Sequence, residues 1–485
     1  MMQSSSQKAN TFQSVLGFFL HSCRAPEKVI ETLAHIGISI SMSAIHSMIW
    51  SLSINARRKI LELGRTMRAA YAYDNFDVNL KPNVPLIEKT TESLKHLTSG
   101  LIFPLQHGIT RDDLKCSEEL WRKSRLNPDN VNISKAERTY VDLLKLHQET
   151  LENNQRLNRR EEFISYLCMR DLIAHRPEYF NNFTKQLKEP DVIEAIPVVK
   201  TDILPVYAME INNSTTSGNI QAIDKMLEQG GIVDPDEILE EDYHPDLDIT
   251  GYVVLIHGDL GTGERVSSVL QRRSIEDTPW DRKQHVIFIP GLFHSKMACA
   301  DAIHRTFIKP SDSRLDDSGL MQDVHILRPN ETGILTSKPG FRRMHQVINH
   351  SGICRRLDMW RVHAQHKNPD HASLELFAES KPTFEDLTKM ANDIAQEICC
   401  ASLPSLRLKE APARDEVQEN ALLMHKYLAL YEEFSYAMNQ GDIGRVETCL
   451  VAWIPLFRAT GKHKYATHLE QFLLNVHFEY PGGLR

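Results

Sequence analysis

Short apolar runs separate longer polar stretches in the middle of the chain, and they predict strands that alternate with helices. Residues 252–257 form an apolar run that leads into a glycine-rich turn with Asp259 at its entrance, and residues 264–274 have the pattern of a helix. A second apolar run follows at 285–290 and ends at Gly291. Strand, helix and strand in this order predict an α/β unit, in which ligands and chemistry lie at the strand ends.

The N-terminal pattern is helical. Apolar residues at helical spacing predict one helix over 26–37, which stops at a glycine, and a second helix over 41–53. Two helices joined by a short glycine turn are typical of a helix-turn-helix. The second helix carries almost no side chains that read bases or bind phosphate, so a plain helical hairpin is favoured and DNA reading is the alternative.

Further strands are predicted before the α/β unit. Aromatic and β-branched residues predict a strand over 69–80, with Asp74 inside it or at its end. Residues 99–105 and 204–211 predict two more extended segments, and residues 219–230 predict a helix. Along the chain, this is the element order of a ribonuclease-H-like core: a meander of strands, then helix, strand, helix and strand.

The predicted fold class is therefore α/β, with a ribonuclease-H-like mixed sheet and large all-α additions at both ends. The chain is expected to be helix-rich overall. The predicted domains are an N-terminal helical segment at 1–68, the core at 69–306 with a polar helical insertion at 112–190, and a helical insertion or C-terminal helical domain at 307–485.

Asp74 and Asp259 are the candidate metal ligands. In the ribonuclease-H-like fold, an acid on the first strand and an acid ending the fourth strand lie side by side because the two strands are neighbours. Adjacent carboxylates repel unless a cation neutralises them, and oxygen ligands suit Mg²⁺ or Mn²⁺. Two such ions activate water and stabilise the leaving oxygen in phosphodiester cleavage. An acid between a strand and a Gly/Thr-rich turn is also typical of a helix cap, which is the alternative.

Charge restricts where a phosphate-bearing partner could bind. The net charge is −8, so phosphate contacts need a local basic patch. Between residues 338 and 361, six cations stand against one acid, Asp358. The cations are Lys338, Arg342, Arg343, Arg355, Arg356 and Arg361. At helical spacing they are compatible with a surface that faces a DNA backbone, but a solvated helix face explains them at least as well.

Cysteines and apolar stretches bear on the compartment. The eight cysteines are scattered without a CxxC pair, so we expect free thiols rather than a disulfide framework or a zinc ribbon. The N-terminus lacks the pattern of a signal peptide, and the apolar stretch at 38–54 is interrupted by serines and too short for a membrane span. An intracellular protein without membrane contact is predicted, with the nucleus favoured over the cytoplasm.

Several motifs resemble a large uncharacterised family of basidiomycete fungi, domain of unknown function 6589. They are YDNFD at 73–77, LTSGLIFPL at 97–105, HGDLGT at 257–262, GLFHSKMACAD at 291–301, KPGFRRMH at 338–345 and RATGKHKYA at 458–466. The resemblance covers nearly the whole chain from residue 26 onward. The family is similar to cut-and-paste transposases with a ribonuclease-H-like core. That similarity implies that Asp74 and Asp259 are the first two catalytic acids and that His294 matches the histidine after the next strand.

The resemblance also implies a third acid, on a helix that follows a long helical insertion. Residues 307–478 look like that insertion, and the sequence stops soon afterwards at Arg485. We therefore expect a truncated gene product or a relic without a complete site. Glu447 is the candidate for the third acid among the acids of the helical tail, although its position in the sequence is not compelling.

Three functions remain open at this point. The leading hypothesis is a transposase-derived protein, inactive as it stands, whose complete form would cleave or join DNA with Mg²⁺ or Mn²⁺. The alternative is a non-enzymatic module that binds DNA or protein, which the helical bulk and the negative charge favour. A nucleotide-binding α/β domain rests only on the glycines around Asp259, which fit neither GxxxxGK[ST] nor GxGxxG.

Overall fold

The chain forms two compact units, which are described separately. In the computed structural model the described residues are 10–79, 94–130, 138–146, 157–175, 177–237, 247–334, 339–399 and 408–485. The sheet unit comprises Met1–Asn130, Thr201–His257 and Glu264–Phe288. The helical unit comprises Val131–Lys200, Gly258–Gly263 and Ile289–Arg485.

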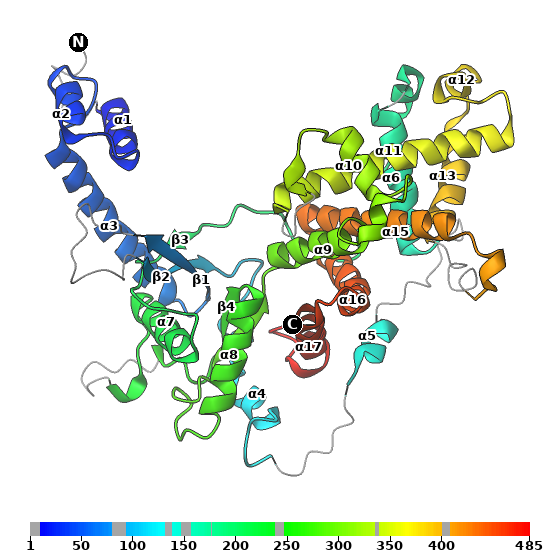
Figure 1. Ribbon diagram of the computed structural model, residues 1–485. Helices are drawn as coiled ribbons and strands as arrows, with labels where there is room; N and C mark the ends of the chain where they lie inside the picture. Colours follow the sequence, from blue (N-terminus) through cyan, green and yellow to red (C-terminus); the bar gives the residue numbers. More distant parts are fainter. Residues whose placement is uncertain are drawn as a thin grey trace. The chain divides into compact units, whose positions relative to one another are not determined.

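A five-stranded sheet with the order β3-β2-β1-β4-β5 forms the centre of the sheet unit (Figure 1). The strands are β1 (Ala69–Asn79), β2 (Leu94–Pro104), β3 (Leu204–Pro205), β4 (Val254–Gly258) and β5 (Val286–Pro290). β1 pairs antiparallel with β2, β2 pairs antiparallel with β3, and β1 pairs parallel with β4. The sheet is therefore mixed, and its first and fourth strands are neighbours.

β5 runs in the same direction as β4. The Val254 N–H donates to the His285 carbonyl at 2.6 Å, and the Gly291 N–H donates to the Gly258 carbonyl at 3.0 Å. From the first bond to the second, the residue numbers increase on both strands, as they do between parallel strands. Both strands are short apolar runs, which suits burial on both faces of a parallel pair.

The strand predictions agree with the structure to different degrees. The strands expected at 69–80, 252–257 and 285–290 are confirmed with small shifts at their ends. The strand expected at 99–105 begins earlier, at Leu94, because these polar residues pair with the exposed half of β1. The extended segment expected at 204–211 contributes only the two residues of β3. Hydrophobic patterning identifies buried strands, but it does not identify a polar stretch that forms a strand through its backbone hydrogen bonds alone.

The described residues of the sheet unit also contain six α-helices, three of which precede β1 in the sequence. They are α1 (Thr11–Ser22), α2 (Glu27–His35), α3 (Met42–Gly64), α4 (Ser117–Lys123), α7 (Thr216–Gln229) and α8 (Leu260–Arg273), whose first turn belongs to the helical unit. Ser41 begins α3 by accepting the Ala44 N–H at 3.3 Å, and Thr215 begins α7 in the same way. The core contains Tyr71, Ile256 and Met226, from β1, β4 and α7.

Two glycines allow α3 and the end of α7 to approach closely. A Cβ atom added at Gly64 would lie 2.2 Å from the Gly230 carbonyl oxygen. No side chain fits in that space, so the contact depends on glycine at position 64.

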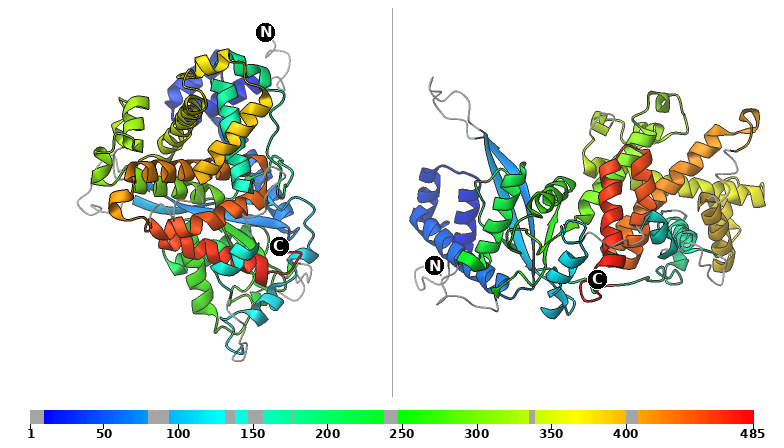
Figure 2. Two further views of the ribbon diagram at one scale, coloured as in Figure 1. Left: turned by 90° about the vertical axis from the view of Figure 1, so that its right-hand side faces the viewer. Right: turned by 90° about the horizontal axis from the view of Figure 1, so that it is seen from below.

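The helical unit has two hydrophobic cores that share α11 and α15. Its helices are α5 (Tyr140–Leu146), α6 (Arg159–His175), α9 (Leu292–Phe307), α10 (Leu320–Leu327), α11 (Phe341–Lys367), α12 (Leu374–Glu379), α13 (Phe384–Cys399), α15 (Glu416–Gln440), α16 (Ile443–Ala459) and α17 (His463–Leu474). One core contains Tyr431, Trp453 and Phe457, and the other contains Phe180 and Trp360. Figure 2 shows α15, α16 and α17 packed side by side.

The expected helix-rich fold with a mixed sheet is confirmed. Within the parts of the chain that the structure describes, no helix has both the length and the apolar composition to cross a membrane.

Candidate functional site

The parallel pairing of β1 and β4 positions the two candidate acids. Tyr71 lies opposite Ile256, and Ala72 lies opposite His257. Asp74 comes two residues after Ala72, and Asp259 comes two residues after His257. Both acids therefore follow the paired residues at the same end of two neighbouring strands.

Asp74 lies where β1 changes from buried to exposed. Tyr73 is buried, whereas Asp74 is exposed. Its Oδ1 accepts the Asn75 N–H at 2.8 Å, and Ser99 of β2 donates its hydroxyl to the Asp74 carbonyl at 3.4 Å. The carboxylate is accessible to a cation from solvent.

Asp259 is half-buried and caps α8. Its Oδ1 accepts the Thr262 N–H at 2.7 Å, and its carbonyl accepts the Gly263 N–H at 3.1 Å. These are the bonds of a helix N-cap, so the capping interpretation is confirmed for one carboxylate oxygen.

Gly291, three residues before His294, lies beside Gly258, the residue that precedes Asp259 in the sequence. A Cβ atom added at Gly291 would lie 3.1 Å from the Gly258 carbonyl oxygen and 3.1 Å from His294 Cδ2. Glycine at position 291 thus leaves room for both the Gly258 carbonyl and the ring of His294, which lies in the first turn of α9. The segment that begins α9 therefore lies beside the residue that precedes Asp259.

Tyr465 of α17 responds to the Asp259 charge. Burial raises the pKa of the Tyr465 phenol, and the carboxylate of Asp259 raises it further, with smaller contributions from Cys299 and Asp301. Sequence reasoning missed this tyrosine because it lies 206 positions after Asp259 (465 − 259).

Glu447, the candidate third acid, lies on α16. Its Oε2 is 2.9 Å from Nε2 of His477, and the side chain is mostly buried. Across the described ranges, no group of three or more histidine, cysteine, aspartate or glutamate side chains is arranged to hold a metal ion. Asp74, Asp259 and His294 thus stay the candidates that the sequence suggests.

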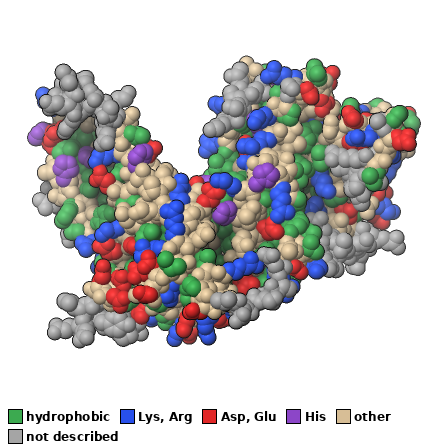
Figure 3. All heavy atoms as spheres, turned by 60° about the horizontal axis from the view of Figure 1, so that its bottom comes forward, with side chains coloured by type: hydrophobic (Ala, Val, Ile, Leu, Met, Phe, Trp, Pro, Cys, Tyr) green, Lys and Arg blue, Asp and Glu red, His purple; other side chains and the backbone are tan. Residues whose placement is uncertain are grey.

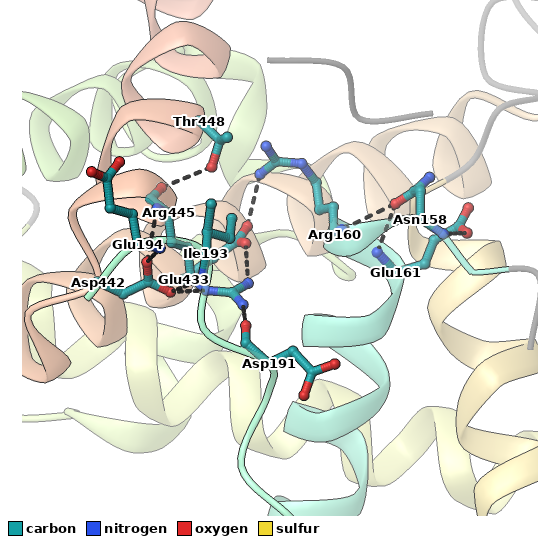
Figure 4. A network of polar contacts seen from close by, with 10 residues as sticks. All are labelled: Asn158, Arg160, Glu161, Asp191, Ile193, Glu194, Glu433, Asp442, Arg445 and Thr448. Carbon is teal, nitrogen blue, oxygen red and sulfur yellow. Dashed lines mark hydrogen bonds and ion pairs between the residues drawn. The ribbon is translucent and has the colours of Figure 1, made fainter. Parts of the chain in front are cut away.

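Two other acids of the helical tail belong to a buried ionic network (Figure 4). Glu433 accepts from Arg160 at 2.9 Å and from Arg445 at 3.1 Å. Asp442 accepts from Arg445 Nε at 3.2 Å and from the Glu194 N–H at 3.0 Å. All four charged side chains are buried. The network joins α6, α15, α16 and the segment around Glu194, so its acids have a structural role.

The packing of α11 buries some cations of the basic segment, residues 338–361, and leaves others exposed. Arg356 is 2% exposed and donates to both Glu432 oxygens at 2.8 Å and to Asp171 at 2.7 Å. Arg355 is paired with Asp323 at 2.7 Å. Both guanidinium groups are thus occupied by acids of the same unit. Arg356 is buried because one face of α11 packs against α6 and α15.

Arg342 and Arg343 remain on the surface at the start of α11. Lys338 lies outside the described residues. Figure 3 shows Lys and Arg side chains interspersed with Asp and Glu over the face in view. A DNA-binding surface would therefore have to be local.

Comparison with protein-family models matches residues 137–485 to "Family of unknown function (DUF6589)". Comparison with curated proteins and with solved structures finds no match.

Proposed function

The chain belongs to the family of unknown function DUF6589, and we propose that it is a transposase-derived protein with a ribonuclease-H-like core. Its sheet would hold Mg²⁺ or Mn²⁺ at Asp74 and Asp259, and its substrate would be the phosphodiester backbone of DNA. A nuclear location is part of this proposal.

The strand arrangement carries the proposal. An antiparallel meander of β1, β2 and β3 is followed by β4 and β5, which run parallel to β1 in the order β3-β2-β1-β4-β5. A ribonuclease-H-like sheet has this order and these directions. Its first and fourth strands are neighbours; here β1 contains Asp74, and β4 is followed by Asp259.

The donor chemistry suits a hard divalent cation. Asp74 and Asp259 supply carboxylate oxygens, which Mg²⁺ and Mn²⁺ prefer. A bound ion would polarise the scissile phosphate and lower the pKa of an attacking water. Asp259 is held in place by its cap on α8, and Asp74 by its position in β1. Both ligands are therefore positioned by regular elements rather than by loops.

The non-enzymatic alternative rests on a different observation. Within the described residues no third acid joins the two aspartates, and Glu433, Asp442 and Glu447 have other partners. The alternative function is a domesticated module that retains DNA or protein binding without cleavage.

Plasmid nicking tests the enzymatic proposal. The full chain is incubated with supercoiled plasmid and Mn²⁺, beside Asp259→Asn and the control Asp77→Asn. Asn still caps a helix, so the first variant removes the charge while keeping the fold of α8. Asp77 is exposed on the same strand as Asp74. Mn²⁺-dependent nicking lost only in Asp259→Asn supports the proposal, whereas equal nicking by all three proteins excludes the metal role of Asp259.

A further inference from the structure

α3 presents an exposed row of side chains that repeats every four residues. Such a row forms one of the slanted ridges along which helices pack against each other. Trp50 is 69% exposed and Ile54 is 54% exposed, and the side chains of Arg58 and Glu62 are also mostly exposed. Figure 1 shows α3 as a long helix that leads from α1 and α2 to the sheet. We call His46, Trp50, Ile54, Arg58 and Glu62 the α3 ridge.

The apolar part of the α3 ridge lies in an uncharged part of the helix. From Met42 to Ala56, α3 contains no Lys, Arg, Asp or Glu. The helices α1 and α2, which pack against α3, carry further exposed apolar side chains. They include Phe12, Val15, Phe18, Phe19 and Val29. Monomeric proteins rarely expose large apolar patches, so this concentration of exposed apolar side chains has the composition of an interaction surface.

The chemistry of the α3 ridge is complementary to itself in the opposite direction. Trp50 lies four residues before Ile54, and Arg58 lies four residues after it. If two copies of α3 cross antiparallel at Ile54, Trp50 of each copy faces Arg58 of the other. A guanidinium group over an indole ring makes a favourable cation–π pair. Ridges spaced by four residues also interdigitate in the commonest class of helix packing.

The same arrangement keeps like charges apart. The two Arg58 side chains lie on opposite sides of the crossing point, a separation of about 12 Å along the helices at about 1.5 Å per residue. Within one copy, Arg58 lies 3.6 Å from Glu62, and their side chains are 70% and 66% exposed. An exposed ion pair of this kind contributes little to stability. Little is therefore lost when Arg58 turns toward an indole ring of another copy.

We propose that the α3 ridge binds a second copy of this chain, with a two-fold axis at Ile54. An isologous contact uses the same patch on both copies, which this pairing does. Each copy contributes a tryptophan and an arginine near the axis, and these residue types are enriched where interfaces concentrate their binding energy. A DNA backbone would use the arginine alone, whereas a second copy covers Trp50 and Ile54 as well. The inference goes beyond the proposed function and does not depend on it.

Sedimentation of the full chain over a range of concentrations tests this dimer. The wild type is expected to reach twice the mass of one chain. Ile54→Glu places two like charges against each other at the axis and should weaken self-association at least roughly a hundredfold. Ile275→Glu is the matched control and should associate like the wild type, because Ile275 is a 79% exposed isoleucine of the same unit.

A mixing experiment tests the position of the axis. Ile54→Lys alone should be as defective as Ile54→Glu, because it also pairs like charges. An equimolar mixture of the two variants places a carboxylate opposite an ammonium group, so the mixture should dimerise more tightly than either variant alone. Circular dichroism checks that both variants keep the helix content of the wild type.

Arg58→Gln tests the cation–π pair with a side chain that is exposed and tolerant of substitution. It removes the charge over Trp50 in both symmetric contacts and should weaken self-association roughly tenfold. This variant stays informative even if a charge at position 54 disturbs the fold.

A wild type that stays monomeric at its highest soluble concentration would overturn the proposed dimer. A dimer that Ile54→Glu and Arg58→Gln leave unchanged would overturn the role of the α3 ridge, and a mixture that does not associate would overturn the axis at Ile54. If the wild type is monomeric and Arg58→Gln lowers its affinity for a DNA duplex in EDTA, the ridge binds DNA instead. Sedimentation does not depend on nicking, so failure of the proposed cleavage is distinguished from failure of the dimer.

Discussion

Ala72 and His257 lie opposite each other in the parallel pair of β1 and β4. They are 185 residues apart in the sequence (257 − 72). Their register determines that Asp74 and Asp259 follow at the same end of the sheet. Because side chains alternate between the faces of a strand, a slip by one residue would move one acid to the opposite face.

This register leads to a prediction on metal binding. Mg²⁺ or Mn²⁺ in excess is expected to raise the melting temperature by a few degrees, because a ligand that binds only the folded state stabilises it. Asp74→Asn and Asp259→Asn should each abolish this shift, while Asp77→Asn should retain it. Differential scanning fluorimetry with and without metal gives the answer. A shift that survives in both single variants would mean that the ion binds elsewhere.

The buried network of the helical unit predicts a large loss of stability. Replacing Arg445 by Met leaves the buried carboxylates of Glu433 and Asp442 short of a partner. Breaking a buried pair in this way costs about 3–5 kcal/mol. Lys225→Met removes one member of the exposed pair Lys225–Glu228 and should cost less than about 1 kcal/mol. Urea unfolding followed by circular dichroism compares the two, and similar midpoints would show that the network contributes little.

The contact between α3 and α7 predicts that position 64 does not tolerate a methyl group. Gly64→Ala would place a Cβ atom 2.2 Å from the Gly230 carbonyl oxygen, so the helices must move apart. Overpacking of this kind costs about 1–3 kcal/mol, which exceeds the gain in helix propensity. Gly251→Ala is the control in the same unit, since its added Cβ has no neighbour within 4 Å. Equal thermal stability of the two variants would contradict the close approach.

His285 predicts a loss of stability in mild acid. It is fully buried, stacks on Trp280, and has no partner for either ring nitrogen within the described chain. Burial, and then the charge of Lys283, lower its pKa to about 3. An unfolded histidine has a pKa of about 6.5. Between these two values the unfolded chain binds a proton that the folded chain does not, so stability falls as the pH drops below about 6.5.

The substitution His285→Phe tests this effect. It should reduce the loss of stability between pH 6.5 and pH 5, by up to about 1.4 kcal/mol for each pH unit. His35→Phe is the control, because His35 is exposed on α2. Urea unfolding at pH 7, 6 and 5 measures the slopes. Parallel pH profiles for wild type and His285→Phe would rule out this histidine as a source of acid sensitivity.

Local features of the site could be predicted because their causes lie within a few residues. The apolar runs of β4 and β5 identify strands, and Asp259 followed by a glycine-rich turn identifies a helix cap, which its bond to Thr262 confirms. The basic segment was predicted less well. Arg342 and Arg356 look alike in the sequence, yet Arg342 is exposed and Arg356 is 2% exposed beside Glu432 and Asp171. Those partners are 76 and 185 residues away.

The sequence by itself determined the types of element, most of their limits, and the aspartates that follow β4 and lie within β1. These depend on side-chain periodicity, turn residues and caps, which act between near neighbours. Only the tertiary structure decided that β1 lies beside β4, that Gly291 lies beside Gly258, and which cations stay on the surface. Such contacts depend on which distant segments of the chain pack together. The same local sequence pattern is compatible with many different packing arrangements. For that reason the two aspartates could be identified from the sequence. That they lie at the same end of the sheet follows only from the register of β1 and β4.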